Sequence, residues 1–305
     1  MKTVGELGED ALVAALLAQL PTKGGGVVAG AGMDDCAVVR VPGAKCWQLL
    51  KTDCVIEGVH FIPDTAPELV GWKAICRPLS DLAATGGKPA HALVTLALRG
   101  DVAADWATGV YEGVGRAARE YGVTVVGGET ARIPGPCWLS VCLTGSVPRG
   151  RAITRGGGRV GDRLYVTGQL GGSFASGRHL TFRPRLAEAR WLVGRFPVRA
   201  MMDLSDGLAA DLPRMARASG TGFVVEPGRL PCAEGCTVAQ ALGDGEDYEL
   251  LFAVGSKRAT ELERAWKKRW PSAPLTCIGA LAEPRLAVGL GESGGYDHFA
   301  ASAAS

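Results

Sequence analysis

The sequence of 305 residues lacks several features that would place it in a functional class at once. It has no run of Lys and Arg, and 33 basic against 31 acidic residues leave a net charge of only +2, so no basic surface for nucleic acid is expected. The apolar stretch 12–20 is too short to span a bilayer, and the N-terminal residues show no charged-then-apolar leader pattern. We therefore expect a cytoplasmic protein that binds neither membrane nor nucleic acid.

Motifs built on Cys and His are equally scarce. None of the nine cysteines forms a C-x-x-C pair, which argues for small apolar side chains in a reducing compartment and against structural zinc. The four histidines, at positions 60, 91, 179 and 298, do not pair at metal-site spacing. The phosphate-binding pattern G-x-x-x-x-G-K-[S/T] and the H-R-D and D-F-G motifs of protein kinases are missing. The chain therefore carries none of these usual nucleotide-binding motifs.

What the chain does contain is a globular composition, with 47% hydrophobic and 21% charged residues, and 44 glycines that gather at expected loops. The length allows two domains, and we place them at 1–147 and 148–305. Helices are expected at 7–20, 67–85 and 103–121, and a hairpin of strands 36–41 and 46–52 is expected around Pro42-Gly43. Hairpin strands mixed with crossover helices indicate an α+β (α/β two-domain) architecture.

Carboxylates next to Gly, Ser or Thr recur where strands end and helices begin. Asp34-Asp35 alone could be a turn pair, and Asp206 alone could be a helix N-cap. Asp81 lies within an apolar helix, where an acid is costly unless it is paired or binds a metal. Six segments share this character: Asp34-Asp35, Thr52-Asp53, Ser80-Asp81, Gly127-Gly128-Glu129-Thr130, Asp203-Leu204-Ser205-Asp206-Gly207 and Gly245-Glu246-Asp247.

Several acids in one cleft would repel one another and raise their pKa values unless a multivalent cation compensates. Mg²⁺ prefers carboxylate oxygen and commonly also holds substrate phosphates. Two adjacent glycines before Glu129, at the expected end of a strand, would leave room for a phosphate to approach the backbone. The sequence therefore predicts magnesium-dependent polyphosphate chemistry, in which positioning and charge neutralisation supply most of the catalysis.

In their order, these motifs resemble those of the thiamine-monophosphate kinase family, within the superfamily that includes aminoimidazole-ribotide synthetase. The likeness extends down to Tyr296-Asp297-His298-Phe299. It rests on Asp34-Asp35-Cys36-Ala37, Lys51-Thr52-Asp53, Glu57-Gly58-Val59-His60-Phe61, Gly71-Trp72-Lys73-Ala74, Ser80-Asp81-Leu82-Ala83-Ala84, Gly127-Gly128-Glu129-Thr130, Arg151-Ala152-Ile153-Thr154-Arg155, Asp203-Leu204-Ser205-Asp206-Gly207-Leu208 and Gly245-Glu246-Asp247-Tyr248.

The resemblance implies direct transfer of the ATP γ-phosphoryl group to thiamine monophosphate, with no phospho-enzyme. It also implies an aminoimidazole-ribotide synthetase-like fold, in which the sheet of the N-terminal domain dimerises into a β-barrel and a C-terminal α+β domain completes the site. Asp206, Arg155 and Asp53 would be catalytic, and His60, Glu246 and Ser293 would bind the acceptor. ATP would be held by Tyr111, Gly128, Arg155 and Ser205. Several Mg²⁺ ions would be held by Asp35, Lys51, Thr52, Asp53, Asp81, Glu129, Asp203 and Asp206.

The chain departs from the family pattern at Met33, Pro78 and Glu129, in a short segment 173–178, and at 292–295, where an aromatic residue is expected. Two alternatives stay open. One is another ATP-dependent enzyme of the same superfamily, although the reactive cysteines of its selenophosphate synthetases and hydrogenase-maturation enzymes are missing. The other is a homologue that binds Mg-ATP without turnover, against which the presence of Asp203, Asp206 and Arg155 argues.

Overall fold

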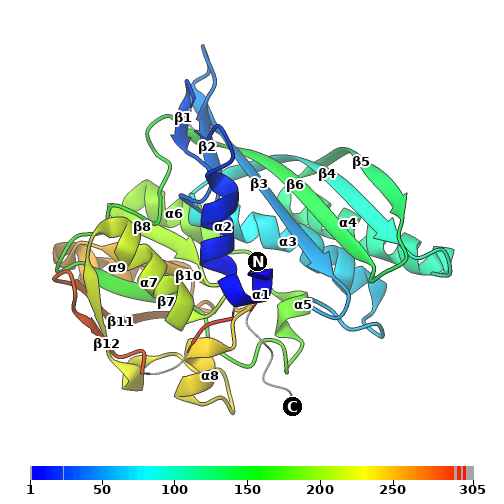
Figure 1. Ribbon diagram of the computed structural model, residues 1–305. Coiled ribbons are helices and arrows are strands. Elements are labelled where there is room, and N and C mark those ends of the chain that lie inside the picture. Colours follow the sequence, from blue (N-terminus) through cyan, green and yellow to red (C-terminus); the bar gives the residue numbers. More distant parts are fainter. Residues whose placement is uncertain (1, 23, 292–293, 297, 300–305) are drawn as a thin grey trace.

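The computed structural model describes residues 2–22, 24–291, 294–296 and 298–299, which form two six-stranded mixed sheets with helices between and around them (Figure 1). The first half comprises α1 (Val4–Leu7), α2 (Glu9–Leu17), β1 (Val27–Ala29), β2 (Ala37–Arg40), β3 (Cys46–Ile56), α3 (Pro67–Ala84), β4 (Lys88–Leu98), α4 (Ala104–Tyr121), β5 (Thr124–Arg132) and β6 (Trp138–Pro148). The second half comprises β7 (Arg163–Thr167), α5 (Arg178–Thr181), α6 (Leu186–Arg195), β8 (Val198–Asp203), α7 (Leu208–Ser219), β9 (Gly222–Val225), η1 (Pro227–Arg229), α8 (Val238–Gly243), β10 (Leu250–Val254), η2 (Ser256–Arg258), α9 (Ala259–Arg269), β11 (Leu275–Ala282) and β12 (Ala287–Val288).

The first sheet has the strand order β1-β2-β3-β6-β4-β5, and α3 packs against one of its faces. Along β6, buried residues alternate with half-buried ones, which is the pattern of a strand with a core side and an open side. The predicted hairpin is confirmed, since Ala37 of β2 pairs with Leu50 of β3. The open face belongs to the alternate residues Thr52, Cys142 and Leu93, which lie opposite one another on β3, β6 and β4.

The helix α3 lies between the two sheets and supplies much of the core. It begins with Pro67 in its first turn, a position that suits proline, and almost every residue from Val70 onward is buried. Its apolar side chains share one cluster with Val141 of the first sheet and with Met201 and Phe252 of the second. Polar residues of α3 are therefore held where the two halves meet.

The second sheet has the order β12-β9-β11-β7-β10-β8, and α7 packs against its other face. At its edge, β8 ends at Asp203 and α7 begins at Leu208, as the sequence predicts. The four residues between them form a loop directed at the first half. The domain boundary at 147/148 falls where β6 ends, before the segment that leads to β7, and it stays a prediction.

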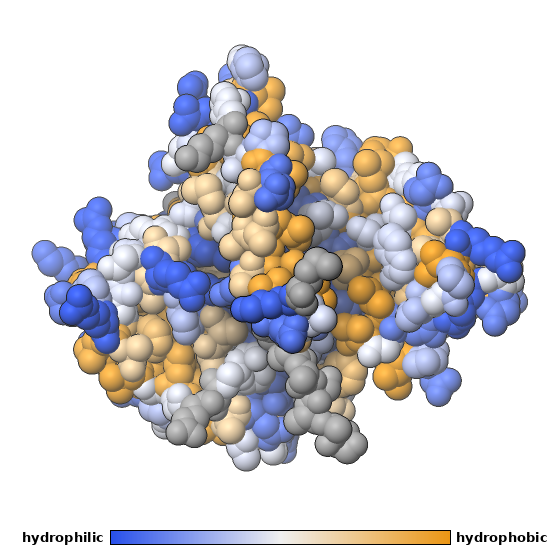
Figure 2. All heavy atoms as spheres, viewed as in Figure 1, coloured by the Kyte–Doolittle hydropathy of each residue, from blue (hydrophilic) through white to orange (hydrophobic). Residues whose placement is uncertain are grey.

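The N-terminal segment is two short helices, so the prediction of a single helix over 7–20 is wrong. Gly8, with φ of 72°, ends α1 and precedes α2, and Thr3 caps α1 through a reciprocal pair with Glu6. No residue of α2 is buried, and its apolar side chains are visible in the middle of the face in Figure 2. Within the described residues, no helix has the length and apolar character that a membrane crossing requires.

The segment Gly127–Thr130 differs from expectation as well. It was expected to close a strand, but β5 continues through it to Arg132, and Gly128 pairs with Val94 of β4. A Cβ atom on Gly128 would lie 1.8 Å from the Val94 carbonyl oxygen, so this glycine serves close strand packing. All of β5 is exposed, because it is the edge strand of the sheet.

Candidate active site

Three buried carboxylates from separate parts of the chain meet between the two halves. Asp35 lies just before β2, Asp81 on α3 and Asp203 at the end of β8. One carboxylate oxygen from each lies within 4.8 Å of the others. All three residues are less than a tenth exposed, and Asp35 Oδ2 has no hydrogen-bond partner among the described residues. Such a set of oxygen donors matches the ligand preference of Mg²⁺.

Burial and mutual repulsion raise the pKa values of carboxylates in this cluster. Burial, reinforced by the charge of Asp35, raises the pKa of Asp203 to about 7. The pKa of Asp81 is also raised, by burial and by its acidic neighbours, although Lys51 opposes this. A divalent cation would reverse both effects by favouring the charged carboxylates.

Lys51, on β3, places its ammonium group among these acids. Its Nζ atom donates to Asp81 Oδ1 at 2.6 Å and lies 3.7 Å from Asp53 Oδ1. Burial lowers the pKa of Lys51, but the carboxylates of Asp81 and Asp53 outweigh it and keep the pKa well above its usual value. A protonated amine offers no electron pair to a metal ion, so the metal role of Lys51 stays a prediction and would involve its backbone oxygen. The ammonium group of Lys51 balances part of the negative charge of Asp81 and Asp53.

Arg155 joins the cluster from the segment that links the two sheets. Its guanidinium donates to Asp35, and its backbone N–H donates to both carboxylate oxygens of Asp34. Burial raises the pKa of Asp34 to about 7, and the charge of Asp35 adds to this. The predicted ATP-binding arginine therefore lies beside the predicted metal ligands.

The β8–α7 loop carries Ser205 and Asp206 into the same cleft, which Asp35, Asp81 and Asp203 also line. Asp206 is not the N-cap of α7, which is Gly207. The loop is held by Asp211, whose Oδ2 atom accepts from the backbone N–H groups of Ser205 and Asp206 at 3.1 Å each. Arg214 then bridges Asp206 and Asp211.

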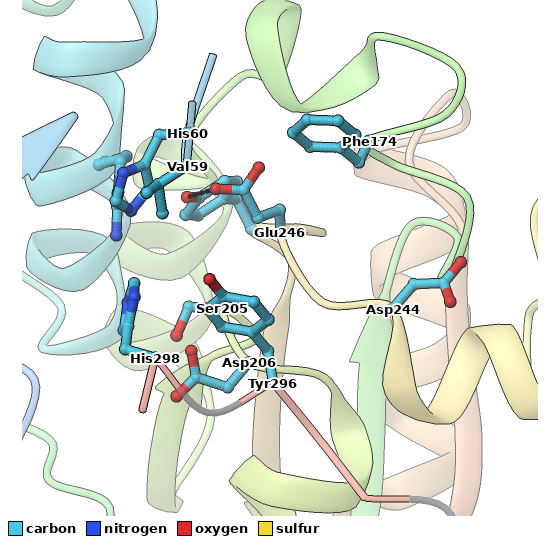
Figure 3. Close-up of a pocket in the computed structure, with 11 residues that line it drawn as sticks. Val59, His60, Phe174, Ser205, Asp206, Asp244, Glu246, Tyr296 and His298 are labelled. Atoms are coloured by element: carbon cyan, nitrogen blue, oxygen red, sulfur yellow. Dashed lines mark hydrogen bonds between the residues drawn. The ribbon is translucent and has the colours of Figure 1, made fainter. Parts of the chain in front are cut away.

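An adjoining cavity of about 270 Å³ opens on the other side of this loop (Figure 3). Ser205 and Asp206 line both spaces, so the two spaces adjoin at this loop. The cavity also contains the predicted acceptor-binding residues His60 and Glu246. Its remaining lining residues are Val59, Arg77, Phe174, Asp244, Tyr248, Tyr296 and His298.

Glu246 is fixed by a fully buried lysine. Lys73 Nζ donates to Glu246 Oε1 and Oε2 at 2.9 and 2.7 Å and to the His60 carbonyl oxygen at 2.7 Å. Burial lowers the pKa of Lys73 to about 8, against the opposing charge of Glu246. The backbone of Glu246 has φ of 53° and that of Tyr248 52°; such left-handed conformations in non-glycine residues are uncommon and gather at functional sites.

His60 is a neutral imidazole. Burial, with the nearby charges of Arg77 and Lys73, lowers its pKa to about 2. Its Nδ1 atom accepts from the backbone N–H of Ile56 at 3.1 Å, so the ring proton lies on Nε2. His60 can therefore donate a hydrogen bond but cannot supply a positive charge.

Four predicted residues lie apart from this site. Thr52 lies on the open face of the first sheet, where its hydroxyl is 3.4 Å from that of Ser140. Gly128 and Glu129 lie on the edge strand β5. Tyr111, on α4, lines a separate groove with Arg116 and Arg119. The predicted acceptor residue Ser293 lies outside the described residues.

Sequence reasoning missed several residues that the site uses: Lys73, Arg77, Phe174, Asp211 and Arg214. A signal existed for two of them. Lys73, Arg77 and Asp81 follow one another at four-residue spacing within an apolar helix, so they share one side of α3. Charged residues on such a stripe are costly to bury without partners, and that cost indicates a site.

Comparisons with known proteins agree with this geometry. Residues 33–147 match the AIR synthase related protein, N-terminal domain, and residues 159–273 match the corresponding C-terminal domain. Thiamine-monophosphate kinase of Rhodopirellula baltica is 37% identical over 83% of each chain. That of Escherichia coli K12 is 32% identical over 96% of this chain and 98% of its own. A solved structure described as AaThiL complexed with AMPPCP and TMP is 31% identical, with a TM-score of 0.82 over 98% of this chain and 99% of the other. The chain belongs to the thiamine-monophosphate kinase family of AIR synthase-related proteins.

Proposed function

We propose that this protein transfers the γ-phosphoryl group of ATP to the phosphate of thiamine monophosphate, with formation of ADP and thiamine diphosphate. An oxygen of the acceptor phosphate forms the new bond to the γ-phosphorus, and the bond from that phosphorus to the β,γ-bridging oxygen breaks. The observation that carries the proposal is that Ser205 and Asp206 line both an acid-lined cleft and a cavity with aromatic and acidic residues. Donor and acceptor phosphates would meet beside these two residues, where the two spaces adjoin.

The acid-lined cleft supports Mg²⁺ binding. An ion with bonds of about 2.1 Å brings its ligand oxygens to within about 4.2 Å of one another, and the three carboxylates already offer oxygens within 4.8 Å. We assign Asp35, Asp81 and Asp203 as principal ligands, with Asp53, whose Oδ2 atom is buried without a hydrogen-bond partner among the described residues. Bound Mg²⁺ supplies charge neutralisation at the phosphates. Arg155, already paired with Asp35, would add a cationic contact to the transferring group.

On the acceptor side, the neutral His60 would donate from Nε2 to a phosphate oxygen without adding charge. Glu246, which Lys73 holds in place, would lie toward the thiamine portion. The positively charged Arg77 lines the same cavity and balances the acids there. This distribution keeps the acceptor phosphate near cations and its organic portion near carboxylates.

The test is incubation of the protein with Mg-ATP and thiamine monophosphate, followed by chromatography of the products. ADP and thiamine diphosphate are expected in equal amounts, and Asp206→Asn should lower kcat about 100-fold or more, as removal of one charge-stabilising group typically does. Release of ADP without thiamine diphosphate would disprove the acceptor assignment. Tight ATP binding without any turnover would favour a non-catalytic homologue.

We also propose that two copies pair through the open face of the first sheet. Three strand spacings separate Asp53 on β3 from Gly128 on β5, or about 14 Å. Because Mg²⁺ ligands lie about 2.1 Å from the ion, Glu129 of the same copy is too distant to share an ion with Asp53. The predicted roles of Gly128 and Glu129 therefore require a second copy to bring these residues to the site.

The apolar character of this face supports the pairing, since Leu93 is 47% exposed. Leu93→Glu should convert the protein to a monomer in sedimentation experiments and abolish turnover, because a charge on the paired face would be buried without a partner. The matched control is Val160→Glu, at an equally exposed apolar residue (48%) beyond the sheet. A dimer that persists in Leu93→Glu would refute this interface.

A further inference from the structure

Phe174 is an unusual residue on the wall of the acceptor cavity. It lies on the short loop between β7 and α5 and leaves 48% of its surface exposed, whereas a large apolar side chain is ordinarily buried. In Figure 3 its ring stands at the rim of the cavity, above Glu246 and apart from Tyr296. An exposed aromatic ring at the mouth of a site is available to a ligand.

The loop that carries Phe174 is held in place by the two residues that directly precede the ring. The backbone N–H of Gly172 donates to Asp244 Oδ2 at 2.8 Å, and the hydroxyl of Ser173 donates to the carbonyl oxygen of Glu246 at 2.7 Å. These bonds tie the loop to the same segment that carries the acids of the cavity. Little conformational freedom is then lost when a ligand contacts the ring.

One face of the Phe174 ring is already occupied. It stacks on the buried imidazole of His179, with the ring centroids 4.4 Å apart and the planes 15° from parallel. The His179 ring is itself fixed, because its Nδ1 atom lies 3.1 Å from the Ser173 carbonyl oxygen. Among the residues that the structure describes, no other ring stacks on Phe174, so the opposite face of its ring offers a flat apolar surface of fixed orientation.

The surroundings of that face favour a cation. Asp206, Asp244 and Glu246 line the cavity together with the rings of Tyr248 and Tyr296, and these three carboxylates outnumber the lining guanidinium of Arg77. Aromatic faces attract cations through the ring quadrupole, and several rings with carboxylates nearby form the kind of cage that binds quaternary nitrogen. A planar heteroaromatic ring with a permanent positive charge satisfies both features at once.

We propose that Phe174 is a specificity-determining residue, whose ring face opposite His179 stacks on the cationic heteroaromatic ring of the phosphate acceptor. This inference rests on the proposed function, in which the acceptor is thiamine monophosphate with its positively charged thiazolium ring. Phe174 then acts on acceptor affinity and leaves phosphoryl transfer itself and ATP binding unchanged.

Three substitutions test the role of the ring. Phe174→Ala removes the stacking face and should raise KM for thiamine monophosphate about 5- to 30-fold, as expected for the loss of one cation–π contact, with KM for ATP and kcat within about 2-fold of their original values. Phe174→Leu retains apolar volume without the ring and should resemble Phe174→Ala. Phe174→Tyr retains the ring and should resemble the unaltered protein.

A control and a second ligand separate this effect from general damage. Leu286→Ala alters a similarly exposed side chain (44%) that does not line the cavity, and KM should stay unchanged. A thiazolone analogue of thiamine monophosphate, which lacks the positive charge, should bind Phe174→Ala and the unaltered protein with nearly equal affinity. Unchanged KM in Phe174→Ala, or an equal rise in KM for ATP, would overturn the inference.

Calorimetric titration of the same proteins with thiamine monophosphate distinguishes this inference from the proposed function. If the unaltered protein forms no thiamine diphosphate, the proposed function fails, but the comparison of binding between the unaltered protein and Phe174→Ala still decides the role of the ring. A 5- to 30-fold weaker binding by Phe174→Ala supports that role. Equal binding by the two proteins, or binding by neither, rejects it.

Discussion

At the scale of single residues, Asp211 shows how a buried side chain positions the loop that carries a site residue. The side chain is fully buried, and its carboxylate accepts from two backbone N–H groups of the loop that carries Asp206. Burial and the charge of Asp206 raise the pKa of Asp211, while Arg214 bridges the two acids. Asp211 therefore positions Asp206 without lining the acceptor cavity.

Asp211→Asn tests this positioning role. The neutral amide keeps the shape but loses the charge-assisted bonds to the loop and to Arg214, which are about twice as strong as neutral ones. Asp206 should then be poorly aligned, and the Mg²⁺ concentration for half-maximal rate should rise about tenfold, or about 1.4 kcal/mol. Glu226→Gln, which disrupts the exposed ion pair of Glu226 with Arg229 outside the cleft, is the control. A lower Tm with unchanged Mg²⁺ activation would indicate a purely structural role.

The sequence indicated which acids matter, and the structure explains why it missed their supports. Asp35, Asp81 and Asp203 stand beside recognisable Ser, Gly or strand-end signals, and they do come together. Asp211 carries no such local signal, because its partners are backbone groups that only the fold of the loop brings near. The metal role of Lys51 stays a prediction, because a motif gives no information on whether a position binds a cation or provides one.

At the scale of elements, the crossing of α3 and α4 depends on two glycines. A Cβ atom at Gly71 would lie 1.9 Å from the Val110 carbonyl oxygen, and one at Gly113 would lie 2.0 Å from the Glu68 carbonyl oxygen. The backbones of the two helices are therefore in direct contact at these two glycines. Because α3 carries Lys73 and Asp81, this crossing also sets their depth in the cleft.

Gly71→Ala should separate the two helices. The added methyl group would clash with backbone atoms, which cannot change rotamer as a side chain can. The free energy of unfolding should therefore fall by about 2–3 kcal/mol. Tm should be lower by roughly 5 °C or more. Gly115→Ala is the matched control on α4, since its Cβ would meet only the flexible end of Arg119. There the better helix propensity of Ala should leave stability equal or about 0.5–1 kcal/mol higher. Equal Tm values for the two variants would contradict this account.

The elements themselves were predictable to different degrees. The hairpin β2–β3, the helix α3 and the β8–α7 junction follow from alternation, from apolar periodicity and from Asp-Gly signals, and the structure agrees. The sequence predicts too early an end for β5, because Gly127-Gly128 resembles a loop. In the structure, pairing with β4 keeps this segment extended. The predicted N-terminal helix is too long, because the apolar periodicity of the sequence continues across Gly8. The positive φ of Gly8 interrupts the helix there.

At the scale of the whole molecule, the acid cluster lies where the two halves meet, and the mutual repulsion of its carboxylates opposes their contact. Asp35 and Asp81 come from the first sheet and α3, and Asp203 comes from the second sheet. Lys51 and Arg155 compensate only part of the charge. Contact between the halves thus depends on what neutralises these carboxylates, which is either protons or a divalent cation.

This dependence has a definite sign. The pKa of Asp203 is about 7 in the folded protein, raised by burial from 3.8, so the folded state holds a proton that the unfolded state has already released. Without a cation, stability is therefore lost as pH rises from about 4 through 7. Mg²⁺ competes with that proton, and its stabilising effect should grow over the same pH window.

We predict that millimolar Mg²⁺ raises Tm by several degrees more at pH 8 than at pH 5.5, because at the lower pH protons already neutralise the cluster and must be displaced. Calorimetric scans with and without EDTA at both pH values measure this difference. Asp203→Asn removes one repelling charge, so its metal-free Tm at pH 8 should exceed that of the unaltered protein, while its response to Mg²⁺ should shrink. An Mg²⁺ response of equal size at both pH values, unaltered by Asp203→Asn, would show that the ion binds elsewhere and that the carboxylates between the two halves are not its site.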